Sequence, residues 1–206
     1  MKVFRKEGGR MKVFRKTWML VFAFLSITCL QAQDDFMARM QAHQPGPQHK
    51  LLEQFVGKWD ISIKWTLAPG KPPFEAKATS EQDMIFGGRF LHAKVKFSLP
   101  GFPENFELIG YDNLKKEYFS TTFMSIETAP MTMLGSLDAA GKVFSWKYEY
   151  PSISGRTIHG RQTTRFENPD RYTAEAYETG NDGKEYKAFE GVWTRATDKK
   201  ATSAKE

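Results

Sequence analysis

The chain has 206 residues with 30 lysines and arginines against 24 aspartates and glutamates, giving a formal net charge of +6. This excess lies in residues 1–32, which hold seven basic side chains and one acidic one, so residues 33–206 carry 23 of each sign and are formally neutral. A neutral remainder gives no support for nucleic-acid binding. The single cysteine, Cys29, belongs to the same leader, so the remainder has no disulfide and no cysteine metal site.

Residues 1–32 have the pattern of a secretory signal peptide. Residues 11–16 are basic, residues 18–30 form an apolar core too short for an ordinary transmembrane helix, and Ala32 offers a small residue before cleavage at Gln33. We therefore expect a secreted or periplasmic protein without stable membrane insertion after cleavage. Residues 1–6 repeat residues 11–16 letter for letter, so residues 1–10 are interpreted as an upstream start extension. Lipidation at Cys29 is the alternative fate, although the preceding residues match a lipoprotein signal poorly.

The stretch from Trp59 to Leu67 alternates without a break. Its odd-numbered positions are apolar and its even-numbered positions are polar or charged. A period of two is typical of a β-strand with one buried face and one solvated face. A lone strand cannot bury five large side chains, so the rest of the chain must provide a sheet that covers them.

A short helix is expected before this strand, and nine more strands after it. Pro47 suits the first turn of a helix over residues 48–56, and Gly57 suits its left-handed end. Residues 33–47 are expected to be a flexible lead-in and residues 197–206 a disordered tail. The other strands, separated by turn-forming residues, are expected at 75–86, 91–99, 106–111, 118–126, 131–137, 143–150, 157–166, 172–179 and 185–195.

Ten short strands with hairpin-length turns and no helix between them predict an all-β antiparallel domain over residues 48–196. The connections favour an up-and-down β-barrel of about ten strands. A two-sheet sandwich is the alternative. The aromatic residues expected to point inward are Trp59, Trp65, Phe97, Phe123, Phe144, Trp146 and Tyr148.

The two ends of the predicted barrel segment resemble those of the calycins, the group of lipocalins and fatty-acid-binding proteins. A short helix running into Gly57-Lys58-Trp59 is similar to their Gly-X-Trp entry. Arg195 ends the last strand, where calycins often carry an arginine that packs over that tryptophan. A guanidinium stacked on the indole would close the floor of the barrel. The resemblance therefore implies structural roles for Trp59 and Arg195.

A closer resemblance is to bacterial proteins of the domain of unknown function 1579. It covers about residues 48–196 and rests on five segments in order, which are His49-Lys50-Leu51-Leu52, Gly57-Lys58-Trp59, Gly87-Gly88-Arg89-Phe90-Leu91, Gly110-Tyr111-Asp112 and Thr194-Arg195. It implies a calycin-like fold and no particular reaction. His49 matches a family position on the helix, where a hydrogen bond between helix and barrel is expected of it.

The sequence has none of the common catalytic or metal motifs. It has no HExxH, no zinc-spaced histidines, no Gly-X-Ser-X-Gly elbow and no phosphate loop. It also lacks a second motif of the haem-binding nitrobindin-like calycins. We predict no catalytic residue, metal or cofactor, with enzymatic activity uncertain. His92 and His159 are expected on the outer face of the barrel, as are Glu81 and Asp83.

The inward aromatic residues are the one feature that suggests a ligand site. Inward alanines and serines would leave room between them, and a ten-stranded barrel encloses more volume than its side chains readily fill. We predict an apolar cavity, open at the end away from the helix, lined by Trp65, Phe97, Phe144, Trp146 and Tyr148. The function expected is binding of a small apolar or amphipathic molecule. The alternatives are a structural or interaction module with a filled interior, and an enzyme that uses the cavity. The sequence does not indicate the oligomeric state.

Overall fold

The computed structural model describes residues 33–180 and 182–197. These residues form two units, of which the first ends at Gln44 and the second begins at Pro45. The expected signal peptide, Cys29 and nearly all of the expected tail lie outside the described residues. In the first unit, residues 33–42 are helical, within the segment expected to be a lead-in. No helix among the described residues is long and apolar enough to cross a membrane.

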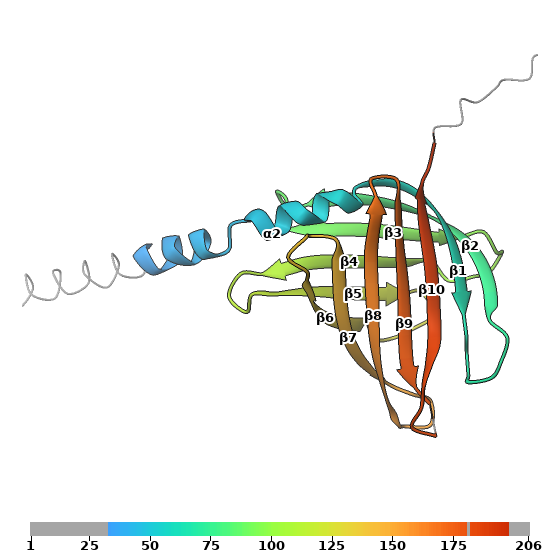
Figure 1. Ribbon diagram of the computed structural model, residues 1–206. Helices are drawn as coiled ribbons and strands as arrows, with labels where there is room; N and C mark the ends of the chain where they lie inside the picture. Colours follow the sequence, from blue (N-terminus) through green and yellow to red (C-terminus); the bar gives the residue numbers. More distant parts are fainter. Residues whose placement is uncertain (1–32, 181, 198–206) are drawn as a thin grey trace, which may run out of the picture. The chain divides into compact units, whose positions relative to one another are not determined.

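The second unit begins with a helical segment and continues with ten strands (Figure 1). The helical segment is α2 (Pro47–Lys50) followed by the 3₁₀ helix η1 (Leu51–Phe55). The strands are β1 (Gly57–Trp65), β2 (Phe74–Ile85), β3 (Phe90–Phe97), β4 (Asn105–Asp112), β5 (Glu117–Met124), β6 (Met131–Leu137), β7 (Val143–Pro151), β8 (Thr157–Asn168), β9 (Arg171–Thr179) and β10 (Glu185–Arg195).

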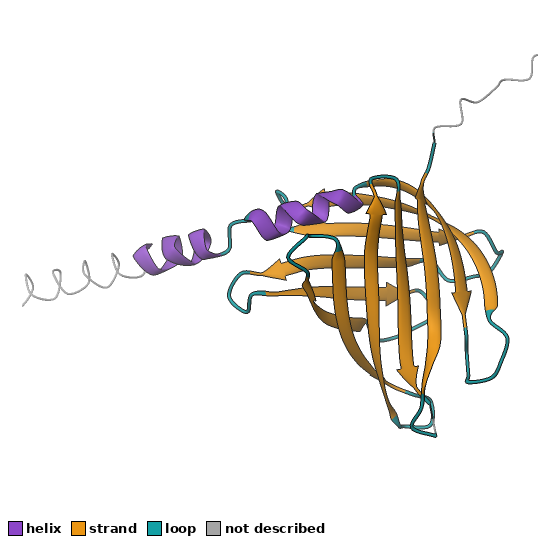
Figure 2. Ribbon diagram, viewed as in Figure 1, coloured by secondary structure: helices purple, strands orange, loops and turns teal. Residues whose placement is uncertain are grey.

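The strands form one closed antiparallel barrel in which each strand pairs with its neighbours in sequence (Figure 2). Closure comes from the pairing of β1 with β10, whose register runs from Trp59 opposite Arg195 to Trp65 opposite Phe189. The up-and-down barrel is confirmed, and the sandwich alternative is wrong. Because β1 follows the helical segment directly, the starts of the odd-numbered strands share the helix end of the barrel, and their ends share the far end.

The alternation in β1 is the one that the sequence predicts. Trp59, Ile61 and Ile63 are at most 4% exposed, while Asp60 and Ser62 face solvent. Phe123 is the exception among the predicted inward aromatics. It lies on the outer face of β5, 38% exposed, and stacks on Phe106 with ring centroids 4.8 Å apart. In β5 the inward parity belongs instead to buried Tyr118 and Ser120.

Gly57 opens β1 rather than ending the helix in the left-handed conformation expected of it. Its φ is +132°, which L side chains rarely adopt, and Val56 ends the 3₁₀ helix with an extended backbone. A Cβ at this position would also collide with Nη1 of Arg195. Glycine is therefore required here both by the backbone and by the arginine that crosses the end of the barrel.

Candidate functional site

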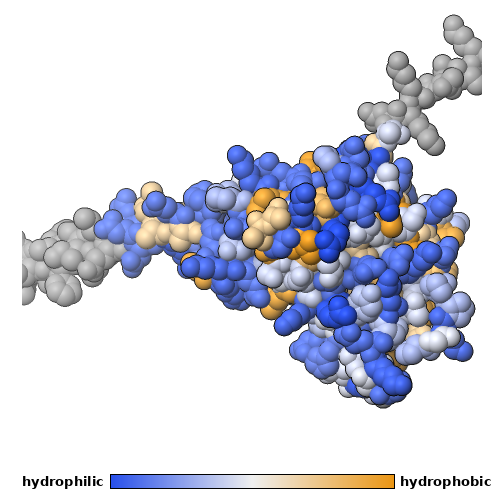
Figure 3. Space-filling model, viewed as in Figure 1, coloured by the Kyte–Doolittle hydropathy of each residue, from blue (hydrophilic) through white to orange (hydrophobic). Residues whose placement is uncertain are grey.

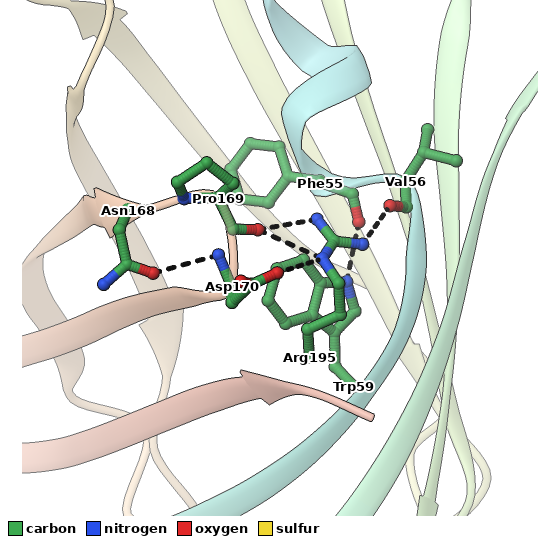
Figure 4. A network of polar contacts seen from close by, with 7 residues as sticks. All are labelled: Phe55, Val56, Trp59, Asn168, Pro169, Asp170 and Arg195. Carbon is green, nitrogen blue, oxygen red and sulfur yellow. Dashed lines mark hydrogen bonds and ion pairs between the residues drawn. The ribbon is translucent and has the colours of Figure 1, made fainter. Parts of the chain in front are cut away.

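The helix end of the barrel is closed by an arginine stacked on a tryptophan (Figure 4). The guanidinium carbon of Arg195 lies 4.3 Å from the ring centroid of Trp59, which is fully buried. Arg195 also donates to the carbonyl oxygens of Val56 and Pro169, at 2.9 and 2.8 Å, and pairs with Asp170 at 3.1 Å. The guanidinium thus joins the helical segment, the β8–β9 turn and β10, as the calycin resemblance implied.

The indole of Trp59 is itself held from the helix side. Its Nε1–H donates to the carbonyl oxygen of Phe55 at 2.8 Å, and Phe55 packs edge-on against Phe166 and Tyr172. These rings belong to one apolar cluster that also includes the buried side chains of Leu52, Leu91, Phe144 and Trp146. The helix end is therefore a packed floor without a polar group left unpaired on the indole.

His49 is buried on the helical segment and accepts a hydrogen bond from the backbone N–H of Gly46 through Nδ1, at 3.1 Å. Its ring meets Tyr111 of β4 edge-on, with centroids 5.9 Å apart. Burial lowers the pKa of His49, a hydrogen bond with the Tyr111 backbone acts in the opposite direction, and nearby Arg89 lowers it slightly. A neutral imidazole that joins helix to barrel fits the structural role expected of this residue.

The five residues predicted to line a cavity all face inward, but they lie in two groups. Trp65 and Phe97 lie at the far end, 5.5 Å apart between ring centroids, in a cluster with Phe102 and Phe189. Phe144 and Trp146 belong to the floor cluster, where their rings stack 5.4 Å apart. Tyr148 is half-buried beyond them on β7. The single lining predicted from the sequence is therefore split between the two ends.

Two of the inward aromatic rings lie against the wall of the barrel, over glycines of neighbouring strands. Gly135 is opposite Trp146, and a Cβ on it would lie 2.5 Å from Cε3 of that ring. Gly160 is opposite Tyr148, and a Cβ there would collide with the phenol ring. Glycine at these positions lets a large ring lie flat over the neighbouring strand. Rings placed against the wall occupy less of the barrel axis than rings pointing straight across it.

A polar cluster that the sequence analysis did not identify lies inside the barrel above the floor. Glu107 has the inward parity of buried Ile109 on β4, and its Oε1 accepts a hydrogen bond from the fully buried hydroxyl of Ser120. Nearby, Gln82 donates to the hydroxyls of Tyr172 and Ser80, at 2.8 and 3.1 Å. Burial raises the pKa of the Glu107 carboxyl, although the Ser120 hydrogen bond partly opposes this.

A second inward carboxylate lies nearer the far end, among tyrosines. Glu178 accepts hydrogen bonds from the hydroxyls of Tyr150 and Tyr186, at 3.0 and 2.9 Å, and a longer one from Tyr148 at 3.3 Å. Burial, together with the Glu178 charge, raises the pKa of Tyr186 to about 12. The phenols therefore remain neutral donors that hold the carboxylate in place at neutral pH.

The outer face carries a groove of about 660 Å³ across β2–β5. The residues that line this groove include His92, Phe106 and Phe123, together with charged side chains such as Lys94 and Glu81. His159 of β8 is exposed and pairs with Glu149 of β7 at 3.3 Å. Both histidines are thus on the outer face as expected.

Among the described residues, no group of three or more His, Cys, Asp or Glu side chains is placed to hold a metal ion. The space-filling view shows a mainly hydrophilic surface with small apolar areas (Figure 3).

Comparison with known proteins gives a family and a fold. A family model described as "Protein of unknown function (DUF1579)" matches residues 44–195. The chain is similar to the crystal structure of Rv2717c from M. tuberculosis, at 11% identity and a TM-score of 0.55, over 75% of this chain and 100% of that one. A redesigned β-barrel is similar at 10% identity, with a TM-score of 0.31, over 73% and 96%. None of the curated proteins matches the chain significantly. At this identity the similarity to Rv2717c shows the barrel fold alone.

Proposed function

The chain belongs to the DUF1579 family of proteins of unknown function, and we propose that within its barrel it binds a small amphipathic molecule. The proposed site is the interior between the packed floor and the far end. In this proposal the floor stabilises the fold, and the rest of the interior receives the ligand.

The observation that carries the proposal is a change in packing along the barrel axis. At the floor, Leu52, Trp59, Leu91 and Phe144 have no exposed surface. Further along, several inward-facing residues keep accessible surface, namely Glu107, Thr122, Tyr148 and Gln162. Side chains that fill an interior completely leave one another no such surface.

Small inward side chains support the same region as the site. Ala78 on β2, Ala93 on β3, and Ala174 and Ala176 on β9 all face inward. They offer apolar wall without occupying the axis, while Glu107 and Ser120 supply a polar group above the floor. An apolar wall with a few convergent polar groups is the usual composition of a small-molecule site.

The test is binding of a neutral amphipathic probe, 1-decanol, measured by calorimetry and by the change in tryptophan fluorescence. We expect Ala93→Leu to lower its affinity about tenfold, because the added side chain projects into the interior beside Glu107, to which Ala93 is paired. The matched control is Ser136→Leu, which adds the same side chain on the exposed face of β6 and should leave binding unchanged. Failure of 1-decanol, decylamine and decanoate all to bind the wild-type protein would overturn the proposal.

Export to the periplasm or the medium is part of the same proposal. It rests on the basic segment and apolar core of residues 1–32, which are followed by Ala32. Protein produced from the full sequence in a bacterium should be recovered outside the cytoplasm and should begin at Gln33 on N-terminal sequencing. Recovery of cytoplasmic protein with an intact leader, or of protein lipidated at Cys29, would contradict this.

A further inference from the structure

The inward-facing wall of the barrel is acidic. Among the described strand residues, the inward parity places two carboxyl groups inside, Glu107 and Glu178, and a single cationic side chain, Arg195. Arg195 is at the floor, where Trp59, Asp170 and the carbonyl oxygens of Val56 and Pro169 already surround its guanidinium. The proposed ligand region thus holds two carboxyl groups. The arginine nearest to the Glu178 cluster, Arg156, uses Nη1 on the carbonyl oxygen of Gly180.

The polar groups next to Glu107 mainly have unused hydrogen-bond acceptors. Ser120 uses its hydroxyl hydrogen on Oε1 of Glu107. Two residues earlier on the same strand, the buried Oδ1 of Asn105 has no hydrogen-bond partner. Positions i and i+2 of a strand are roughly 7 Å apart on one face, so both side chains must lean toward each other to reach a single polar head group. An unpaired buried acceptor costs free energy until a donor reaches it.

Aromatic rings complete the environment that a cation prefers. Trp146 and Tyr148 face inward on β7, and Tyr150 and Tyr186 surround Glu178 beyond them. The faces of such rings attract cations, most strongly where water is excluded. A carboxylate head group would meet the opposite situation, since it would bring a negative charge beside two carboxyl groups and has no hydrogen to donate to either of them.

We propose that the barrel selects its ligand by charge, taking an amphipathic molecule with a primary ammonium head that donates to Glu107 and Asn105. Its apolar part packs on the small side chains of Ala78, Ala93 and Ala174. This inference rests on the proposed function, since it specifies the ligand class of that same interior. Fatty acids, the ligands that the calycin resemblance would suggest, are excluded by the acidic wall.

Binding of the ammonium head releases a proton from Glu107. Burial raises the pKa of the Glu107 carboxyl in the free protein and an incoming positive charge lowers it, so at a pH between these two pKa values the proton leaves to solvent while the amine keeps its own. The ionisable group that faces Glu107 from another strand is Tyr172 of β9, whose pKa lies well above its ordinary value because the ring is buried. Tyr172 therefore stays neutral, and Ser120 and Gln82 do not titrate.

The experiment compares three ten-carbon probes that differ only in the head group, namely decylamine, 1-decanol and decanoate, below their micellar concentrations at pH 8. Isothermal titration with the full-sequence protein should give decylamine an affinity at least tenfold higher than decanoate. Glu107→Gln should lower the affinity for decylamine at least tenfold and leave that for 1-decanol unchanged, because a buried charge pair loses one partner. Titrations in pairs of buffers of different ionisation enthalpy, repeated over a series of pH values, should also detect the released proton at a pH between the pKa values of Glu107 in the free and bound protein, and Glu107→Gln should abolish it.

The matched control is Glu81→Gln, which removes an exposed carboxylate paired with Lys58 on the outer face and should change none of these affinities. Decanoate binding as tightly as decylamine would overturn the charge selection and leave the proposed function standing. Failure of all three probes would overturn the proposed function itself. Loss of decylamine affinity in Glu178→Gln but not in Glu107→Gln would overturn the assignment of the head group to Glu107.

Discussion

The floor of the barrel and the interior beyond it are built from the same ten strands but solve different problems. At the floor, large rings from η1, β1, β7, β8 and β9 interlock, and the guanidinium of Arg195 stacks on Trp59. Beyond it, Ile61, Ile63 and Phe97 form a second buried cluster at the far end. Alanines lie between the two clusters, and Glu107 and Glu178 lie where a purely structural core would place apolar residues. Buried carboxyls cost stability, and their presence in only one of the two regions is what makes that region the proposed binding site.

The largest difference between the two regions should appear when a tryptophan is removed from each. Trp59→Ala should destabilise the protein by about 3–5 kcal/mol, because it leaves a large void in a close-packed floor. Trp65→Ala should cost about 1–2 kcal/mol, since that indole is half-buried at the far end. Urea unfolding followed by circular dichroism measures both. Equal losses, or a loss within about 0.5 kcal/mol for Trp59→Ala, would contradict the assignment of the floor as the stabilising region.

The second effect concerns the cover of the floor. Arg195→Ala should cost about 2 kcal/mol, because it removes the stacking on Trp59 and leaves the carbonyl oxygens of Val56 and Pro169 without their donors. Arg195→Lys keeps the charge but not the planar fork, so it should recover less than half of that loss. Full recovery by lysine in the same unfolding measurements would show that charge alone, rather than the stacked guanidinium, stabilises this end.

A smaller effect is expected in the ligand region, where the contribution of Glu107 to the free energy of unfolding falls as the pH rises. The pKa of Glu107 is raised in the folded protein, so its contribution to stability is full below the ordinary value of 4.5 and is lost as pH rises through the raised pKa. Glu107→Gln should therefore gain stability relative to wild type as pH increases from about 4 to 8. Unfolding curves across that range provide the measurement. Parallel curves for the two proteins would mean that the carboxyl is not buried as described.

The smallest effect belongs to His49 at the floor. Its pKa is lowered, so its contribution is full above the ordinary value of 6.5 and is lost as pH falls through the lowered pKa. His49→Asn keeps an acceptor for the Gly46 N–H and does not titrate. Between about pH 7 and 5 the wild type should lose less than about 1 kcal/mol relative to this variant. A relative gain for wild type on acidification would contradict a neutral, accepting imidazole.

The sequence predicted the strands well, because alternation along each strand is a local property. All ten strands were located within two residues at each end, and the packing of Arg195 over Trp59 was implied by the calycin resemblance. Phe123 was assigned to the wrong face because β5 offers aromatic residues of both parities, and only the buried Tyr118 and Ser120 decide between them. Local periodicity does not resolve such a strand.

The candidate site was predicted less well, because it depends on the level of each residue along the barrel axis. Parity correctly placed Trp65, Phe97, Phe144, Trp146 and Tyr148 inside, but the stagger of the strands puts them at two different levels. The contact of Gln82 with Tyr172 joins residues 90 positions apart and needs the full register. Glu107 could have been found, since it lies on the same face of β4 as Asn105 and Ile109. The glycines opposite Trp146 and Tyr148 could also have been found from the hairpin registers.

Native mass spectrometry tests the central claim, that the interior beyond the floor holds a ligand, most directly. Protein produced from the full sequence and purified without detergent should carry a small molecule that remains bound under native conditions and is released on denaturation. Ala93→Leu should reduce the occupied fraction, while Ser136→Leu should not. Wild-type protein that shows only the mass of its own chain, and that also fails to form a complex with added decylamine, would contradict the claim.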